Sequence, residues 1–473
     1  MIKHPTQPTV AIAGGGLAGL AAACALADSG FRVTLFERRP YLGGRASSYE
    51  HPGTGEVVDN CQHVLFRVCT NLVEFYRRIG VENKIRWFDE MTFIEPGGRT
   101  SVMHASPLPA PLHTAPSFLR FPFLSIKDKL AISRSIAALT LTSQPDTGRS
   151  FLDWCQQHGQ TQNAIERFWK PILVSALSED LDLISISAAA QVVRESMKSP
   201  EARHMGVPSI PLTDLYSRAG DYIRDRGGEI RFRTSLEAFF PQSTRVQVRV
   251  TDQKATEQSF EYLVLALPFD ALDRVLPQSA EGAPLREQIG HFESSPITGI
   301  HLWFDRQITY LDHAVLLDRT IQWMFHKSRL LTTRGRGSPE SSGSYVELVV
   351  SASKSLIDKS RAEIVDLALK EVREFFPAAR AADLVKSTVI KEVHATYSPR
   401  PGIDAYRPHQ STAWPRVFLA GDWTASGWPA TMEGAVRSGY LAAEALMRAT
   451  GIKDARFLMA DLPASGLMRL FAK

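Results

Sequence analysis

The chain has 473 residues, with 54 Lys and Arg against 50 Asp and Glu, which gives a formal net charge of +4. This length accommodates two or three domains or one large interleaved domain, and so mild a charge without a dense Lys/Arg run argues against nucleic-acid binding. The four cysteines lack C-x-x-C spacing, so neither a zinc site nor a disulfide framework is expected. No run of about 18 apolar residues occurs, and the first residues lack the layout of a secretory signal. We therefore expect a cytoplasmic protein without a membrane span or a metal.

The segment TVAIAGGGLAGLAAACALADSGFRVTLFE predicts a βαβ unit. Residues 9–13 form a short apolar strand, 17–27 an Ala-rich helix and 31–36 a second strand. A G-x-G-x-x-G run lies between the first strand and the helix, and Glu37 ends the second strand. Strand, glycines, helix and acid in this order are typical of dinucleotide binding.

The glycines of this run have separate physical tasks. Gly14 allows the tight turn, Gly16 lets the backbone approach a pyrophosphate, and Gly19 lets helix and strand pack closely. The helix N-terminus adds free N–H groups and positive potential, while Glu37 accepts hydrogen bonds from a ribose. The cofactor contacts expected here are Gly14, Gly16, Leu17, Ala18, Gly19, Glu37 and Arg38.

The continuation ERRPYLGGRASS indicates which dinucleotide is bound. Gly43 and Gly44 make a second close-approach loop, and Arg45 can reach a diphosphate through two hydrogen bonds. This E-x(5)-G-G-R run resembles the FAD-binding signature of the amine oxidase and carotenoid desaturase superfamily. The alternative is a glycine turn with a surface arginine.

The stretch EVVDNCQHVLF places four polar residues between apolar ones: Asp59, Asn60, Gln62 and His63. Burying such groups without partners costs several kcal/mol. We therefore expect this bend to face a cofactor or a substrate.

Two insertions follow in the middle of the chain. Residues 104–205 are expected to form a mostly helical insertion that faces substrate and membrane, and 296–394 a substrate domain with a sheet, because ITGIHLWFD and SYVELVVSAS alternate. The prolines near residue 110 argue against a regular helix there. We therefore expect a loop in this region, with Phe118, Phe121, Phe123 and Leu124 as its exposed apolar residues.

A second cofactor segment, RVFLAGDWTASGWPATMEGAVRSGYLAAEAL, lies near the other end of the chain. It predicts a strand over 417–420 and a helix that begins near Met432. Asp422 is placed to hold the ribityl and phosphate end of a flavin, and the helix N-terminus suits a flavin that carries negative charge. Because the last cysteine is Cys155, we expect the FAD to be bound non-covalently. The contacts expected from this segment are Gly421, Asp422, Thr431, Met432, Glu433 and Ala435.

Signatures near both ends predict an α/β fold in which a Rossmann-like FAD-binding domain is interleaved with an α+β substrate domain. The FAD-binding domain would comprise 1–103, 206–295 and 395–455, and 456–473 would form a membrane-surface tail. Resemblance to the superfamily also implies that Thr234 and Leu236 flank the adenine.

The bend narrows the resemblance further. VVDNCQHVLF looks like the D-N-G-Q-H-V-L segment of hydroxysqualene dehydroxylases, also called squalene-associated FAD-dependent desaturases, and GWPATMEGAVRSGYLAA and FWKPILVSALSE fit that family as well. Cys61 stands where the family has glycine. The resemblance implies that reduced FAD delivers a hydride from N5 to the allylic carbon of hydroxysqualene, with loss of water, to give squalene for hopanoid synthesis. An external electron donor would recycle the flavin, since no second dinucleotide motif occurs.

The catalytic hypothesis rests on the same bend. His63 is the expected proton donor, because its pKa lies near neutrality, and Asp59 orients it or fixes the loop. Asn60 and Gln62 would hydrogen-bond the flavin or the backbone. Alternatively, His63 and Asp59 only stabilise the turn. Glu433 is a second acid candidate, although a glutamate at a helix N-terminus is more often a cap.

A C30 isoprenoid partitions into lipid, so we expect contact with the inner face of the cell membrane. The C-terminal RFLMADLPASGLMRLFAK combines apolar side chains with Arg456, Arg469 and Lys473, and could lie at the lipid interface together with the Phe-rich loop. Each segment could equally pack on the protein itself.

Three other functions compete with this one. A carotenoid desaturase or isomerase would have the same fold, and an amine or porphyrinogen oxidase would use oxygen, with Trp423 and Trp428 offered as an aromatic cage. A non-enzymatic escort of prenyl lipids is disfavoured, because a carrier needs no intact flavin signatures.

Overall fold

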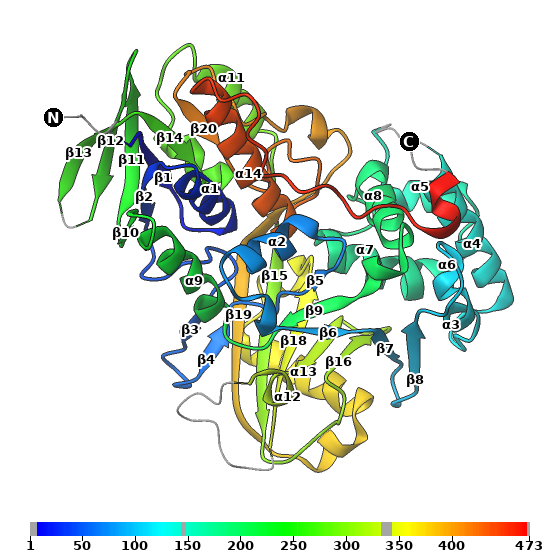
Figure 1. The fold of residues 1–473 in the computed structure, drawn as a ribbon. Helices are drawn as coiled ribbons and strands as arrows, with labels where there is room; N and C mark the ends of the chain where they lie inside the picture. Colours follow the sequence, from blue (N-terminus) through cyan, green and yellow to red (C-terminus); the bar gives the residue numbers. More distant parts are fainter. Residues whose placement is uncertain (1–6, 143–147, 253, 333–342, 471–473) are drawn as a thin grey trace.

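The computed structural model describes residues 7–142, 148–252, 254–332 and 343–470. A five-stranded parallel sheet occupies the upper part of Figure 1. Its strands come from three distant segments of the chain, and their order in the sheet is β10 (Glu229–Phe232), β2 (Arg32–Glu37), β1 (Thr9–Ala13), β14 (Tyr262–Leu265) and β20 (Val417–Leu419).

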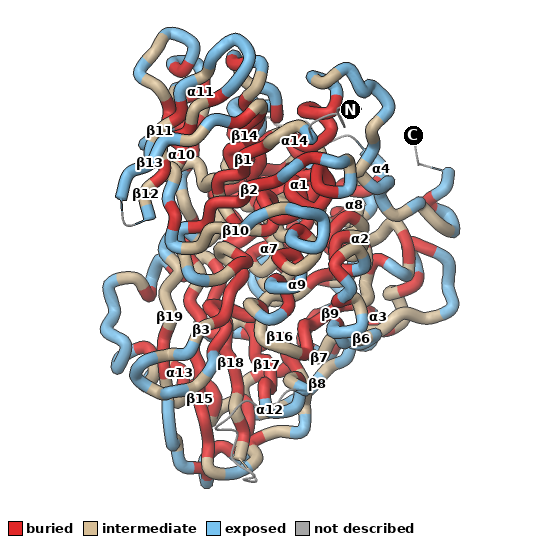
Figure 2. Tube along the Cα trace, turned by 60° about the vertical axis from the view of Figure 1, so that its left-hand side comes forward, coloured by how far each residue is buried: buried red, intermediate tan, exposed pale blue. Residues whose placement is uncertain are grey.

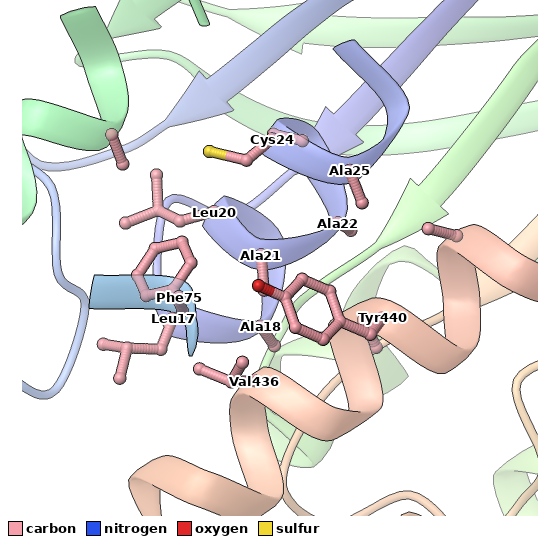
Figure 3. Close-up of a cluster of buried hydrophobic side chains, with 14 of the residues drawn as sticks. Leu17, Ala18, Leu20, Ala21, Ala22, Cys24, Ala25, Phe75, Val436 and Tyr440 are labelled. Carbon is pink, nitrogen blue, oxygen red and sulfur yellow. The ribbon is translucent and has the colours of Figure 1, made fainter. Parts of the chain in front are cut away.

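Two helices pack closely beside this sheet. Helix α1 (Leu17–Asp28) is buried along almost its whole length, and α14 (Met432–Ala449) lies against it, as Figure 3 shows for Val436 and Tyr440 facing the alanines of α1. The approach is so close that a Cβ at Gly439 would overlap the Ala18 carbonyl oxygen. Glycine and alanine at this contact therefore join the first and last parts of the chain. The same region contains α2 (Thr70–Arg78), α9 (Leu212–Arg224), α10 (Phe269–Val275), α11 (Ala283–Ile289) and the small sheet β11 (Ser235–Pro241), β12 (Val246–Thr251), β13 (Ala255–Phe260).

A seven-stranded mixed sheet forms the lower part of the molecule (Figure 1). Its order is β19 (Leu384–Tyr397), β15 (Ser294–Phe304), β18 (Ser344–Ser351), β17 (Trp323–His326), β16 (His313–Leu316), β7 (Glu90–Ile94) and β8 (Thr100–His104), with α13 (Arg361–Phe375) beside it. The two strands expected from their alternation, β15 and β18, pair antiparallel. One difference concerns β7 and β8, of which residues 90–103 were expected in the FAD-binding part and residue 104 in the insertion. They join the second sheet instead, because β7 pairs in parallel with β16.

The insertion after β8 is helical. It contains α3 (Ala115–Leu119), α4 (Ile126–Leu141), α5 (Phe151–Gln157), α6 (Gln162–Ala164), α7 (Lys170–Leu177) and α8 (Ile186–Met197). The expectation of an exposed Phe-rich loop is wrong. A proline is tolerated in the first turn of the short helix α3, and the aromatic side chains turn inward, where the rings of Phe121 and Phe123 stack at 4.7 Å. All four residues are buried: Phe118, Phe121, Phe123 and Leu124.

Burial follows this architecture: the inner strands of both sheets and α1 are buried, whereas the edge strands β10, β8 and β19 are partly exposed and the peripheral loops are exposed (Figure 2). No helix among the described residues is long and apolar enough to cross a membrane.

Candidate FAD-binding and active site

The loop between β1 and α1 is shaped as a cradle. Gly14 has φ +109°, and a Cβ at Gly19 would overlap the Gly14 carbonyl oxygen, so both positions require glycine. Gly16 is different, because the nearest atom to its Cβ position is the Cα of Gly44, 3.8 Å away. Gly16 is also the N-cap of α1 and offers no side chain to the free N–H groups there. Residues Leu17, Ala18 and Gly19 form that first turn. The open space, the bare backbone and the uncapped helix end fit a pyrophosphate.

Glu37 lies at the end of β2 beside this cradle. Its Oε2 accepts a hydrogen bond from Gly15 N at 2.7 Å, and its Oε1 accepts one from Arg39 N at 2.7 Å. The Arg39 guanidinium donates to the Gly44 carbonyl oxygen at 2.7 Å. Arg38, which we expected to contact the cofactor, is exposed. Arg39 thus supports the two glycine loops through Glu37 and Gly44, a role that was not anticipated from the sequence, and contact of Arg38 with the cofactor stays a prediction.

The two cofactor segments meet at an ion pair. Arg45 Nη2 lies 2.6 Å from Asp422 Oδ1, and Arg45 Nη1 donates to the Ala395 carbonyl oxygen at 2.9 Å. Gly421 N donates to Ser438 Oγ of α14 at 2.8 Å, which fixes the turn before Asp422. The arginine of the first signature and the aspartate of the second thus lie in one site. This is what a cofactor site formed by both ends of the chain requires.

The polar bend connects β4 (Val57–Asp59) to β5 (Leu65–Phe66). It contacts the segment that contains Arg45. Asn60 donates through Nδ2 to the Arg45 carbonyl oxygen and accepts a hydrogen bond from Ser47 N at 3.2 Å. Asn60 therefore bonds backbone, one of the two roles expected of it, and holds the bend beside Arg45.

Asp59 is buried and its carboxylate is fully engaged. Oδ1 accepts from Ser48 Oγ at 2.5 Å and from Leu212 N at 3.3 Å, and Oδ2 accepts from Lys327 Nζ at 2.6 Å. Burial alone would raise the pKa of Asp59, but the Lys327 ammonium holds it below its usual range. Of the two roles expected for Asp59, these contacts favour fixing the loop over orienting His63.

His63 is positioned by its own turn. Its Nδ1 lies 2.8 Å from the Cys61 carbonyl oxygen, and because a carbonyl only accepts, Nδ1 carries the hydrogen. Nε2 is then the nitrogen that can take up or release a proton. Burial lowers the pKa of His63 from its ordinary value, so the neutral ring predominates at pH 7.

A buried lysine beneath the bend was not anticipated from the sequence. Lys327, at the start of α12 (Lys327–Leu330), donates to Gln62 Oε1 at 2.8 Å as well as to Asp59, and Gln62 Nε2 donates to the His63 carbonyl oxygen at 3.0 Å. Lys327 Nζ also lies 3.3 Å from Glu347 Oε2 on β18. The sequence did contain one sign of this buried pair: each of two apolar strand regions, WMFHK and YVELVV, includes a charged residue.

Glu347 makes the stability of the protein depend on pH. Burial raises its pKa to about 7 from 4.5, although Lys327 opposes the shift. Between pH 4.5 and pH 7 this carboxyl is ionised in the unfolded chain but still protonated in the folded protein. The free energy of unfolding therefore falls as pH rises through this range, and the fall is complete above pH 7. We expect Glu347→Gln to remove this fall and to stabilise the protein by up to about 3 kcal/mol at pH 8. Urea unfolding of both proteins at pH 4.5 and pH 8 measures it, and identical pH profiles would refute it.

Glu433 has a structural position. Its Oε1 accepts from Asn71 Nδ2 at 2.9 Å and its Oε2 from Leu72 N at 2.7 Å, so the carboxylate caps the N-terminus of α2. Thr431 caps α14 through Gly434 N at 3.1 Å. The cap weighed against catalysis was at the N-terminus of Glu433's own helix, whereas the carboxylate caps α2 instead. Met432 and Ala435 lie on α14 with Glu433, and the catalytic and cofactor roles of these residues stay predictions.

The remaining expected residues lie as follows. Thr234 N donates to the Glu37 carbonyl oxygen at 3.0 Å, and Leu236 follows on β11, so both are adjacent to the end of β2. Trp423 and Trp428 are buried in separate apolar clusters and do not face each other as a cage. Contact of Thr234 and Leu236 with adenine stays a prediction.

Comparison with known proteins agrees with this geometry. The family model for flavin-containing amine oxidoreductases matches residues 17–447. The chain belongs to this family, it is a flavin-dependent oxidoreductase, and its α/β fold is that of the amine oxidases and phytoene desaturases. FAD is the cofactor that membership implies, and the glycine cradle and the Arg45–Asp422 pair fit it.

Among curated proteins, the chain is 28% identical over 461 residues to a 15-cis-phytoene desaturase of Synechococcus elongatus, covering 93% of this chain and 95% of the relative. A probable zeta-carotene desaturase of the same organism is also 28% identical, over 94% of this chain and 99% of the relative. Among solved structures, an oxidoreductase from Methanosarcina mazei has a TM-score of 0.70 at 17% identity, covering 93% of this chain and all of that one. A putrescine oxidase has a TM-score of 0.69 at 16% identity, covering 94% and 99%.

Proposed function

We propose that the protein is a hydroxysqualene dehydroxylase, which replaces the allylic hydroxyl of hydroxysqualene by hydrogen to give squalene for hopanoid synthesis. The observation that carries the proposal is the place of the DNCQH bend: Asn60 bonds the backbone of Arg45, so the segment most typical of that enzyme lies beside the FAD signature. The relatives that match over nearly the whole chain bear the names of desaturases of carotenoids, which are also long isoprenoids.

Bound non-covalently and reduced by an external donor, FAD supplies the hydride. The protein must then supply one proton, so that the oxygen leaves as water, and keep the reacting carbon dry. His63 is the proposed donor, acting through Nε2 because Nδ1 is committed to Cys61. Asp59, Lys327 and Gln62 hold its backbone, since Gln62 bonds both Lys327 and the His63 carbonyl.

His63→Ala tests this role. Because burial lowers the pKa of His63, the wild-type rate should rise as pH falls through that pKa, below the ordinary value of 6.5. The variant should be about 100-fold slower and insensitive to pH in that range. Asp59→Asn is a poorer probe, since it also disturbs the pair with Lys327. Single-turnover reoxidation of reduced FAD by hydroxysqualene measures the rate, and near wild-type turnover of His63→Ala would remove the residue from the chemistry.

A phytoene-type desaturase is the second candidate, because the curated relatives carry that activity in their names. The two reactions run in opposite directions at the flavin. Anaerobic incubation of the reduced protein with hydroxysqualene, and of the oxidised protein with phytoene, followed by product analysis, separates them. Squalene from the first supports the proposal, and a desaturated carotenoid from the second overturns it.

The substrate also suggests where the protein works. Hydroxysqualene dissolves in lipid rather than water, so we propose that the protein collects it at the inner face of the cell membrane as a peripheral protein.

A further inference from the structure

The exposed leucines of the described residues come from two segments of the chain that contact each other through Leu467 N and the Ala110 carbonyl oxygen. They fall within 108–141 and 467–470, in the helical insertion and the C-terminal turn η8 (Gly466–Leu470). Ile126 joins them. Their exposed fractions are 43% for Leu108, 46% for Leu112, 61% for Leu119, 78% for Ile126, 54% for Leu130, 47% for Leu141, 44% for Leu467 and 78% for Leu470. Large apolar side chains gathered in this way mark an interaction surface rather than scattered exposure.

Helix α4 is apolar on two sides. Ile132 and Leu139 face the core of the insertion and are fully buried. Ile126, Leu130 and Leu141 recur at helical spacing on the outward side. A helix that only covers its own core would carry polar residues there, so the outward side of α4 is suited to a second apolar environment.

Within residues 105–142 the charged side chains that reach the surface have one sign. Arg120, Lys127, Lys129 and Arg134 lie on or beside α4, whereas Asp128 is the only acidic residue between 105 and 142. Asp128 is buried, where Asn163 Nδ2 donates to it at 2.7 Å. The outward side of α4 therefore presents cations and aliphatic groups without exposed carboxylates, which complements anionic head groups above acyl chains.

The C-terminal turn continues this surface. Leu467 N donates to the Ala110 carbonyl oxygen at 2.9 Å, and Ser465 N donates to the Lys198 carbonyl oxygen at 3.0 Å. Figure 1 shows the turn beside the helices of the insertion. Met468 packs inward and is buried, while Leu467 and Leu470 point out. The tail is thus bound to the insertion rather than free. Phe471 and Lys473, also expected at the interface, lie outside the described residues.

We infer that this docking face, formed by the outward side of α3 and α4 together with η8, seats the protein on an anionic phospholipid membrane. The proposed function requires a contact of this kind with the membrane, so the inference partly rests on that function. The apolar core beneath the docking face also contains Cys61 of the bend, which places the membrane against the part of the protein that adjoins the site.

Co-sedimentation of the FAD-loaded protein with vesicles tests the inference. On vesicles of equal parts phosphatidylcholine and phosphatidylglycerol, Ile126→Glu with Leu130→Glu should lower the partition coefficient at least about tenfold, because two apolar anchors become anions. Lys127→Glu with Arg134→Glu should lower it about tenfold on these vesicles and little on pure phosphatidylcholine. Val385→Glu, at a position 60% exposed on β19, is the matched control and should bind as wild type.

Wild-type binding by the Ile126/Leu130 variant would overturn the inference. So would a dimer in solution that this variant converts to a monomer, since the face would then join two copies of the chain. Failure of the proposed function is separate: a protein that binds vesicles through this face but yields no squalene from detergent-dispersed hydroxysqualene retains the docking face and loses the assigned reaction.

Discussion

Replacing Lys327 by Met is expected to destabilise the protein by about 3–5 kcal/mol, because it leaves the carboxylate of Asp59 buried without its cation. The Asp59–Lys327 pair is 2.6 Å apart, with side-chain exposures of 5% and 3%. Glu347 loses its nearby cation as well. Urea unfolding at pH 7 measures the change as a lower midpoint with an unchanged slope.

Two further variants control for this result. Adding Asp59→Asn to Lys327→Met should recover part of the loss, since the orphaned charge disappears. Lys170→Met breaks an exposed pair with Glu166, 3.0 Å apart, and should cost less than about 0.5 kcal/mol. A loss below about 1 kcal/mol in Lys327→Met would mean that the buried groups are not ionised in the folded protein.

Gly16→Ala should leave the fold intact but weaken FAD binding about 100-fold, because the added Cβ fills the space through which the pyrophosphate approaches the backbone. The nearest atom to that Cβ is 3.8 Å away, an ordinary contact. Fluorescence titration of the deflavinated protein with FAD measures the affinity, and unfolding without FAD measures the fold.

Gly19→Ala is the informative contrast. Its Cβ would overlap the Gly14 carbonyl oxygen, so both the fold and FAD binding should suffer. If Gly16→Ala bound FAD as tightly as wild type, the cradle would not be the pyrophosphate site. If both variants lost stability equally, Gly16 would be needed for packing as Gly19 is, and not for FAD binding alone.

The nucleotide-binding half was predictable because its signals are local. The apolar run before Gly14, the Ala-rich segment and the run before Glu37 give β1, α1 and β2 within a residue or so of their observed ends, since each depends on neighbouring residues and on the glycine spacing. The second signature was equally easy to recognise from its local sequence. Because both signatures are typical of binding one flavin, their proximity in the fold could also be predicted.

Long-range contacts were not predictable in the same way. Lys327 is 268 positions from Asp59, and nothing in either local pattern pairs them. The Phe-rich loop failed for a related reason: its prolines do rule out a long helix, but Phe118 and Phe121 are drawn inward by Phe93 and Phe168 from other segments. Exposure of an apolar residue is decided by partners that the local sequence does not contain.

The bond between Arg45 and Asp422 has a consequence for biogenesis. During synthesis, the nascent polypeptide can shape the glycine cradle early, yet it lacks β20, Asp422 and α14 until translation has passed residue 449. Flavin loading must therefore wait until this second segment has been synthesised, and chains that terminate before residue 416 should accumulate as colourless products prone to degradation.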